Sequence, residues 1–164
     1  MSVPMTVSIR PATSADLPLI AGLIRDLATY EKLDHQVRFD EAALGQHLFA
    51  PRPHAEVLIG EVDGEPQGFT LFFHNFSTFE GRPGIWVEDL FVRPAARGAG
   101  LGKALLRHCA ALAVERGCAR LEWSVLDWNA PAIALYRALG ARPLDDWMMM
   151  RVDGAALTAL GQPG

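Results

Sequence analysis

The pattern of apolar and polar positions along the chain predicts an ordered series of strands and helices. Strands are indicated where apolar and polar side chains alternate, or where a short apolar run lies between turn residues. These predicted strands are residues 7–10, 56–62, 67–76, 85–92, 120–126 and 147–152. Apolar residues at helical spacing predict helices over residues 13–28, 40–49, 102–116 and 129–140.

The order of these elements predicts an α/β fold. Residues 63–66 form a turn between two hairpin strands, Gly117 is expected to end the third helix, and Asn129 is expected to cap the fourth. The series β-α-α-β-β-β-α-β-α-β implies a single mixed, mostly antiparallel β-sheet with helices on both faces.

Composition narrows the class of protein. The chain has 164 residues, of which 50% are hydrophobic and 21% are charged, as is typical of one globular domain over residues 1–164. A formal net charge of −4 without a basic run argues against a nucleic-acid partner. No apolar stretch approaches the roughly 20 residues that span a bilayer, and the N-terminus lacks signal-peptide features. We therefore expect no membrane partner and a cytoplasmic location.

The cysteines and histidines predict neither a disulfide nor a metal site. Cys109 and Cys118 are the only cysteines. Nine residues of helix would separate them by about 13 Å, which is too far for a disulfide. We therefore expect two structural thiols in a reducing compartment. The five histidines lack metal-ligand spacing, so no metal is predicted.

The most informative segment is residues 87–103. An apolar strand that contains two adjacent carboxylates, Glu88 and Asp89, is followed by a glycine-rich turn and then by a helix. A helix that begins after such a turn presents unpaired backbone N–H groups, which suit a phosphate or pyrophosphate. Two acids beside that site suggest base chemistry next to a phosphorylated cofactor.

Three glycine-loop templates compete for this turn. A P-loop requires G-x-x-x-x-G-K-[ST], but the spacing of residues 98–103 differs and no hydroxyl residue follows Lys103. A dinucleotide-binding turn requires a third glycine where Lys103 stands. The template R-x-x-G-x-G is filled by Arg97, Gly100 and Gly102. A plain strand-to-helix turn would need only one glycine.

The filled template and the order of elements resemble the GCN5-related N-acetyltransferases (GNAT), in which this turn binds the pyrophosphate of acetyl-CoA. Further motifs, which together cover almost the whole chain, are similar to the diamine and thialysine N-acetyltransferase branch. They are Ile9-Arg10-Pro11-Ala12-Thr13, Tyr30-Glu31-Lys32-Leu33, Val87-Glu88-Asp89-Leu90-Phe91-Val92, Val125-Leu126-Asp127-Trp128-Asn129 and Leu135-Tyr136-Arg137-Ala138-Leu139-Gly140-Ala141. The resemblance implies the GNAT fold, acetyl-CoA as cofactor with CoA as product, and a homodimer.

The same resemblance implies a set of site residues. Glu88 would be the base or proton relay, and Tyr136 the general acid. The cofactor would be bound by Leu90, Phe91, Val92, Arg97, Gly98, Ala99, Gly100, Leu101, Gly102, Lys103, Asn129, Pro131, Ala132 and Tyr136. The amine site would be lined by Tyr30, Glu31, Glu88, Glu122, Trp123 and Ser124.

Acetyl transfer to an amine requires a neutral nucleophile. An alkylammonium of pKa about 10.4 is neutral in only about one part in a thousand at pH 7.4, a deficit of roughly 4 kcal/mol. A base near the amine, acting directly or through a water, meets this requirement. Glu88 and Asp89 are the candidates, because carboxylates in mid-strand are costly to bury. Strand alternation places them on opposite faces, so they are not expected to point at the same substrate atom. One of the two is expected only to satisfy loop N–H groups.

The departing CoA thiolate benefits from a proton or a hydrogen bond, for which Tyr136 is the candidate. Asn129 and Tyr136 lie seven residues apart, which places an amide and a phenol on one helix face. A covalent route would need an activated thiol. Cys109 lies in a helix that is predicted to be buried, and Cys118 follows its end, so direct transfer is expected.

The identity of the amine stays open. A long cationic substrate favours several carboxylates along its length, which would be Glu31, Asp34, Glu88 and Asp127. Lys32 and His35, however, stand where the polyamine-preferring relatives are more acidic. Lys32 would pair with the carboxylate of a thialysine- or lysine-like substrate, or it is simply a solvated surface charge.

We therefore expect an acetyl-CoA-dependent N-acetyltransferase for a small-molecule primary amine, either a diamino acid or a di- or polyamine. One alternative is an acetyltransferase for another amine, such as an antibiotic or a protein terminus. A second alternative is a non-catalytic acyl-CoA-binding sensor. The apolar run Trp147-Met148-Met149-Met150 indicates either an interface of a dimer or an interior strand.

Overall fold

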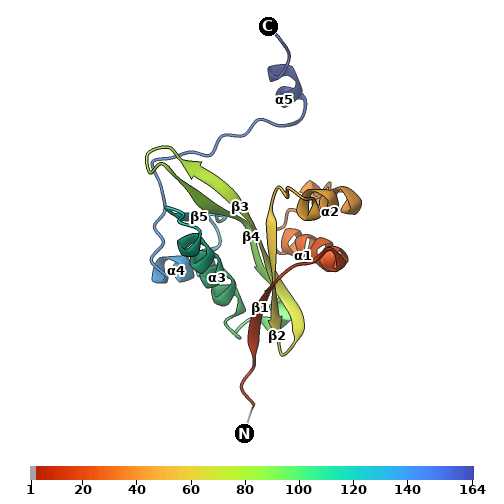
Figure 1. Cartoon of the computed structure of the whole chain (residues 1–164), viewed down its shortest axis with the longest axis vertical. Coiled ribbons are helices and arrows are strands. Elements are labelled where there is room, and N and C mark those ends of the chain that lie inside the picture. The colour runs from red at the N-terminus through yellow and green to blue at the C-terminus, as the bar shows by residue number, and fades with distance from the viewer. Residues whose placement is uncertain (1–2) are drawn as a thin grey trace. The chain divides into compact units, whose positions relative to one another are not determined.

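A computed structural model describes residues 3–164 and divides into two compact units, Met1–Ser124 and Val125–Gly164 (Figure 1). The first unit contains the sheet. Its strands are β1 (Val7–Pro11), β2 (Glu56–Val62), β3 (Glu65–Ser77), β4 (Arg82–Val92) and β5 (Leu121–Trp123). They follow one another in space in the order β1-β2-β3-β4-β5, antiparallel except for the parallel pair of β4 and β5.

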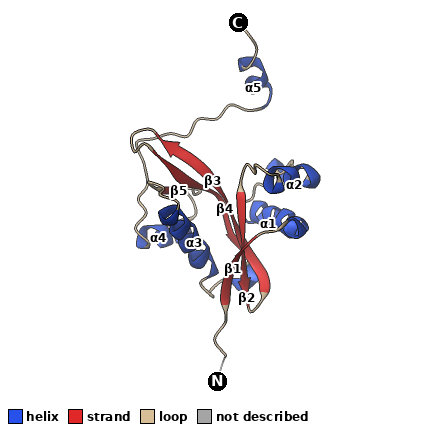
Figure 2. Cartoon of the chain, in the orientation of Figure 1, coloured by secondary structure: helices blue, strands red, loops and turns tan. Residues whose placement is uncertain are grey.

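Helices cover both faces of this sheet, as the sequence predicts (Figure 2). One face carries α1 (Leu17–Tyr30) and α2 (Glu41–Phe49), and the other carries α3 (Leu101–Glu115). Short 3₁₀ turns precede α1, follow it, and join β4 to α3; they are η1 (Ser14–Asp16), η2 (Asp34–Gln36) and η3 (Pro94–Ala96). The architecture is therefore the expected mixed α/β sheet.

Two buried clusters hold the layers together. Beneath α1 and α2, the residues Ile20, Leu23, Leu48, Val57, Ile59, Phe69 and Phe91 form one cluster. Beneath α3, the other cluster consists of Leu58, Phe72, Ile85, Val87, Leu101, Leu105, Cys109 and Ala113. In a regular strand, Val87 and Phe91 would point to the same face, because they are four positions apart. They belong to different clusters instead, which indicates an irregularity in β4 between them.

Helix α3 is packed closely onto β2 and β3. Its buried stripe begins at Leu101, which is 2% exposed, and continues through Leu105 at helical spacing. A Cβ on Gly60 would lie 2.6 Å from the Leu101 side chain, so the absence of a side chain on β2 permits this approach. Full burial of a leucine contributes about 1.5–3 kcal/mol, and α3 is thereby held with its first turn against the sheet.

The second unit contains α4 (Ala130–Ala138) and α5 (Gly154–Leu160). Asn129 caps α4 as predicted, since its side-chain oxygen accepts a hydrogen bond from the Ala132 N–H at 3.4 Å. Helix α5 was not predicted, because its seven residues are too few to show a helical period. Within the described residues, no helix is long and apolar enough to cross a membrane.

The prediction of strands over 147–152 and 120–126 is wrong in part. Residues 147–152 have no regular structure and pair with no strand; Trp147 is 77% exposed and Met150 is 84% exposed. An apolar run is a strand only where a neighbouring strand accepts its backbone hydrogen bonds, and in the described chain none does. Strand β5 spans only three residues for the same reason: its ladder with β4 ends at Trp123.

Candidate active site

The irregularity in β4 is a β-bulge at Glu88. On the facing strand, Leu71 pairs with Asp89 and Phe72 pairs with Val87, so Glu88 is the extra residue. A bulge inserts one residue into one strand and reverses the alternation beyond it. This explains why Val87 packs beneath α3 while Phe91 packs beneath α1.

The bulge corrects the expectation that Glu88 and Asp89 lie on opposite faces. Val87 faces α3, so its neighbour Trp86 faces the other side of the sheet, which α1 covers. Glu88 accepts a hydrogen bond of 3.0 Å from the indole N–H of Trp86. Asp89 precedes Phe91 by two residues and therefore shares its face, which α1 covers. Both carboxylates consequently lie on the α1 side of the sheet.

Strand β5 separates from β4 at the same point. The two strands pair only where Ile85–Val87 face Leu121–Trp123. From Glu88 onward, that edge of β4 carries no further strand among the described residues. Backbone polar groups along an unpaired edge are open to a ligand, which is the property that the predicted contacts of Leu90 and Val92 require.

Asp89 is the carboxylate whose titration is most strongly altered. Its pKa is raised to about 7, chiefly by burial and further by the negative charges of Glu88 and Glu31. Burial also raises the pKa of Glu31, at the C-terminal end of α1. At neutral pH, the Asp89 carboxyl can therefore either hold or accept a proton. Glu88 is exposed, and one of its carboxylate oxygens accepts the hydrogen bond from the Trp86 indole N–H.

The glycine turn meets the geometric requirements of a pyrophosphate site. Gly98 and Gly100 have φ values of 93° and 81°, a region that other residues enter only with strain. A Cβ on either would meet nothing within 4 Å, so the space over the turn is open. Helix α3 begins at Leu101 without a side-chain cap, which leaves its first N–H groups for a ligand. Exposed Lys103 adds positive charge.

Arg97 links the predicted cofactor residues to the predicted amine residues. Its Nε donates a hydrogen bond of 3.3 Å to the Val92 carbonyl. Its guanidinium carbon lies 4.4 Å from the ring centroid of Tyr30, within the range of a cation–π contact. The Tyr30 ring is in turn 6.2 Å from that of Phe91.

Two of the predicted cofactor residues have side chains that point into the core. Phe91 is 4% exposed and Leu101 is 2% exposed, so only their backbone groups are accessible to a ligand. Ala99 is half-buried in the turn, and Gly102 has an ordinary φ, with a Cβ that would lie 3.7 Å from Val92. The conformation of the turn thus depends on Gly98 and Gly100.

The remaining predicted amine residues are partly engaged by neighbours. The Glu122 carboxylate accepts hydrogen bonds from Asn75 at 3.2 Å and from Arg120 at 3.0 Å. Trp123 is half-buried at the end of β5, and Ser124 follows it, exposed. These residues are held where β5 leaves β4, because Trp123 pairs with Val87.

Lys32 has a structural role as well as a predicted substrate role. Its φ of 60° places it in the left-handed conformation that ends α1, and its N–H donates to the Thr29 carbonyl at 3.1 Å. Asp34 accepts a hydrogen bond from the Thr29 hydroxyl. Either residue can still meet a ligand, since both are exposed.

The other predicted site residues belong to the second unit. Asn129, Pro131 and Ala132 form the start of α4, and the half-buried Tyr136 lies on the same helix. The Asn129 oxygen is engaged in its cap.

The Cys109 thiol stays protonated at neutral pH and offers no nucleophile. Burial raises the pKa of Cys109 to about 11, and Cys118 packs against the cluster beneath α3. In the described part of the chain, no group of three or more histidine, cysteine, aspartate or glutamate residues is arranged to hold a metal ion.

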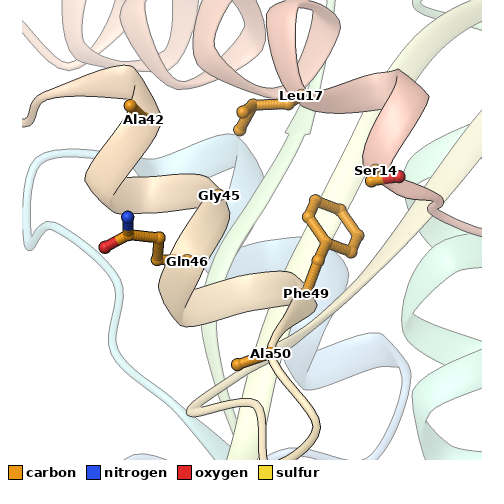
Figure 3. A pocket seen from close by; sticks show the side chains of 7 residues that line it. All are labelled: Ser14, Leu17, Ala42, Gly45, Gln46, Phe49 and Ala50. Atoms are coloured by element: carbon orange, nitrogen blue, oxygen red, sulfur yellow. The ribbon is translucent and has the colours of Figure 1, made fainter.

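A separate depression lies between the start of α1 and helix α2 (Figure 3). It has a volume of about 450 Å³ and is lined by Ser14, Leu17, Ala42, Gly45, Gln46, Phe49 and Ala50. None of these side chains carries a charge. The depression therefore lacks the titratable groups that general acid–base chemistry requires, whereas the bulge carries two of them.

Comparison with known proteins agrees with this geometry. The profile of the acetyltransferase (GNAT) family matches residues 23–141, which include the bulge, the glycine turn and α4. The chain belongs to the GNAT family. The expected fold and the expected acetyl-transfer activity are thereby confirmed.

Curated and solved relatives of this GNAT chain match over most of its length. The thialysine N-epsilon-acetyltransferase of Bos taurus is 40% identical over 165 residues, covering 94% of this chain and 96% of the relative. The L-ornithine N5-acetyltransferase NATA1 of Arabidopsis thaliana is 31% identical, covering 93% and 86%. The solved integron cassette protein VCH_CASS6 of V. cholerae has a TM-score of 0.79 at 26% identity and covers 96% of this chain and 98% of its own.

Sequence reasoning missed two residues that contact the bulge. Trp86 lies two positions before Glu88, and period-two spacing would have predicted that they share a face. Thr70 contacts the bulge from the facing strand, and no signal in the sequence identifies it, because the contact depends on strand register. The roles of the predicted site residues stay predictions.

Proposed function

We propose that this chain transfers the acetyl group of acetyl-CoA directly to a primary amine of a small molecule, with a diamino acid or a polyamine as the substrate class. The observation that carries the proposal is the bulge, which gathers Glu88 and Asp89 on one face immediately before the glycine turn. The family uses acetyl-CoA, and the open, uncapped start of α3 suits its pyrophosphate.

In this proposal Glu88 accepts the ammonium proton, directly or through a water. The amine nitrogen then forms a bond to the acetyl carbon, and the bond from that carbon to sulfur breaks. Tyr136 supplies its phenolic proton to the departing thiolate, the nitrogen releases its second proton as the amide forms, and a proton returns to Tyr136 through solvent. Neutralising the amine at pH 7.4 costs roughly 4 kcal/mol. Proton acceptance by Glu88, with Asp89 beside it, is therefore the largest contribution of the protein to catalysis in this proposal.

The substrate class rests on charge around the bulge. Glu31, Glu88 and Asp89 interact electrostatically, and together they attract an ammonium group. Lys32, exposed at the end of α1, offers a partner for a substrate carboxylate. This combination favours a diamino acid. The relatives named for thialysine and L-ornithine act on molecules of that class.

We further propose that both compact units form one catalytic domain, that the chain is cytoplasmic, and that it assembles as a homodimer. The family match spans the boundary between the units at Ser124, which supports a single domain.

Unpaired Cys109 and Cys118 suit a reducing compartment, which supports the cytoplasmic location. Exposed Trp147, Met148, Met149 and Met150 provide apolar surface for a second copy, which sedimentation of a Met149→Ser variant tests.

The experiment that tests the activity is thiol release from acetyl-CoA with a panel of amines. The panel contains thialysine, lysine, ornithine, spermidine, putrescine and an aminoglycoside. We expect the highest kcat/KM with a diamino acid. Release only with the aminoglycoside would assign a different substrate class, and tight CoA binding without release from any amine would identify a sensor.

A further inference from the structure

Thr70 is a polar residue in the middle of the core. It lies on β3 opposite Leu90 and is completely buried. Its hydroxyl donates a hydrogen bond of 2.9 Å to the backbone carbonyl of Asp89, the residue directly after the bulge. Buried hydroxyl groups in an apolar cluster are costly unless they bond, so this residue type at this position calls for an explanation.

The other side of the Thr70 hydroxyl contacts α3. Its oxygen lies 3.9 Å from the sulfur of Cys109. A hydroxyl has one proton, and Thr70 gives it to the Asp89 carbonyl, so the thiol is the donor in the second contact. Cys109 keeps its proton at neutral pH because burial raises its pKa to about 11. A chain of hydrogen bonds thus runs from α3 through β3 to the bulge.

This series of hydrogen bonds ends at the bulge, where the β3–β4 ladder is irregular and where the proposed base lies. A bulge interrupts the regular exchange of backbone hydrogen bonds, and its geometry depends on the groups that bond it locally. The Asp89 carbonyl belongs to the second of the two carboxylate residues. A hydrogen bond to it restrains the backbone torsion of Asp89, and with it the path of β4 directly after the bulge.

We propose that Thr70 is a positioning residue for acetyl transfer, whose hydroxyl holds the β4 bulge in the conformation that presents Glu88 and Asp89 to the amine. The proposal rests on the proposed function, since it assigns those carboxylates to the amine. Thr70 acts through the backbone of Asp89 and does not touch the substrate. Cys109 supports it by orienting the hydroxyl.

Two substitutions separate the hydroxyl from the shape of the side chain. Thr70→Val keeps the volume and removes the hydroxyl, whereas Thr70→Ser keeps the hydroxyl. We expect Thr70→Val to lower kcat on the order of tenfold and to shift the acidic limb of the pH–rate profile, with the KM for acetyl-CoA within about twofold of the wild type. Thr70→Ser should restore kcat and the pH profile to near the wild-type values.

Ser77→Ala is the matched control. Ser77 is the other buried polar residue of β3, and its hydroxyl oxygen accepts a hydrogen bond of 3.2 Å from the Glu80 N–H, at the end of the strand remote from the bulge. Its loss should leave the pH profile unchanged. A Thr70→Val enzyme with the wild-type kcat and pH profile would overturn the proposal, and so would a Thr70→Ser enzyme as impaired as Thr70→Val.

Hydrogen exchange provides a readout that does not depend on activity. In the free protein, amides of residues 87–91 should exchange faster in Thr70→Val than in wild type or Thr70→Ser. If the wild type acetylates no amine, the proposed function fails, and unchanged exchange at these amides separately overturns the role of Thr70. Should Thr70→Val not fold, Thr70→Ala, which adds no atoms to the core, is measured in the same way with the same criteria.

Discussion

The β4 bulge and the glycine turn are neighbours in sequence but differ in how they are built. The turn is exposed, and its conformation follows from backbone angles that only glycine adopts readily, at Gly98 and Gly100. The bulge lies in a central strand of the sheet, and its chemistry follows from two adjacent carboxylates, exposed Glu88 and the more buried Asp89, whose pKa is about 7. One region offers backbone N–H groups, and the other offers titratable groups.

This difference predicts different sensitivities. A site made of backbone N–H groups has no titratable group of its own, so binding to it depends little on pH but strongly on local conformation. A site made of carboxylates near a buried position depends on pH and on the packing that keeps water away. Substitutions in the two regions should therefore alter different kinetic constants.

The largest expected effect is that of Glu88→Gln. Removing the proposed base should lower kcat on the order of a hundredfold or more, because general base catalysis contributes roughly 10²–10⁴. The affinity for acetyl-CoA should stay near the wild-type value, because we propose that the turn binds this cofactor. Steady-state kinetics and calorimetric titration with CoA measure the two quantities. Glu65→Gln, at an exposed carboxylate at the start of β3, is the control and should leave kcat unchanged.

An equal loss of CoA affinity in Glu88→Gln would contradict the separation between the two regions. A wild-type kcat would remove Glu88 from the chemistry altogether and leave Asp89 as the candidate base.

Gly100→Ala should show the opposite pattern. Its φ of 81° disfavours any residue with a Cβ by roughly 1–2 kcal/mol, so the turn should rearrange and CoA should bind about tenfold more weakly. Gly117→Ala is the matched control: it has a φ of 69°, equally open surroundings, and lies just beyond the other end of α3. Both variants should lose similar stability in thermal unfolding. Equal CoA affinity in both would show that the turn does not bind the cofactor.

The same comparison explains what the sequence could predict. The glycine turn could be predicted because it is formed by residues that are close together in the chain. The positions of Arg97, Gly100 and Gly102 are enough to identify it. The bulge could not be predicted from the sequence, because it arises from the register between β3 and β4. Strand alternation therefore gave the wrong faces for Glu88 and Asp89.

Longer segments show the same limit. Helices α1, α2 and α3 begin and end within a few residues of the predicted bounds, because their apolar stripes and caps are local signals. The apolar run from Trp147 to Met150 has the composition of a strand but finds no strand to pair with in the described chain. Pairing is a property of two segments, and one segment alone does not reveal it.

Asp89→Asn should change how stability depends on pH. The pKa of Asp89 is raised in the folded protein to about 7 from 3.8, so between these values the folded state binds more protons and loses stability as pH rises. Asparagine cannot ionise and escapes this loss. The variant should therefore gain about 1–3 kcal/mol of unfolding free energy relative to wild type between pH 5 and pH 8. Urea titrations at several pH values measure it, and a difference independent of pH would contradict the raised pKa.

Tyr30→Leu has the smallest expected effect and tests whether the two regions are coupled. The Tyr30 ring lies against the guanidinium of Arg97, so it orients a cation of the turn from the side of the amine site. Losing this contact should weaken CoA binding by about threefold, the size of an exposed cation–π contact. Phe39→Leu is the control, because it removes a second arginine–ring contact, in which Arg25 lies 4.9 Å from the ring, and involves neither Tyr30 nor Arg97. If CoA affinity is unchanged in Tyr30→Leu while the KM for the amine rises, then Tyr30 serves the amine alone and the turn orients Arg97 without help from α1.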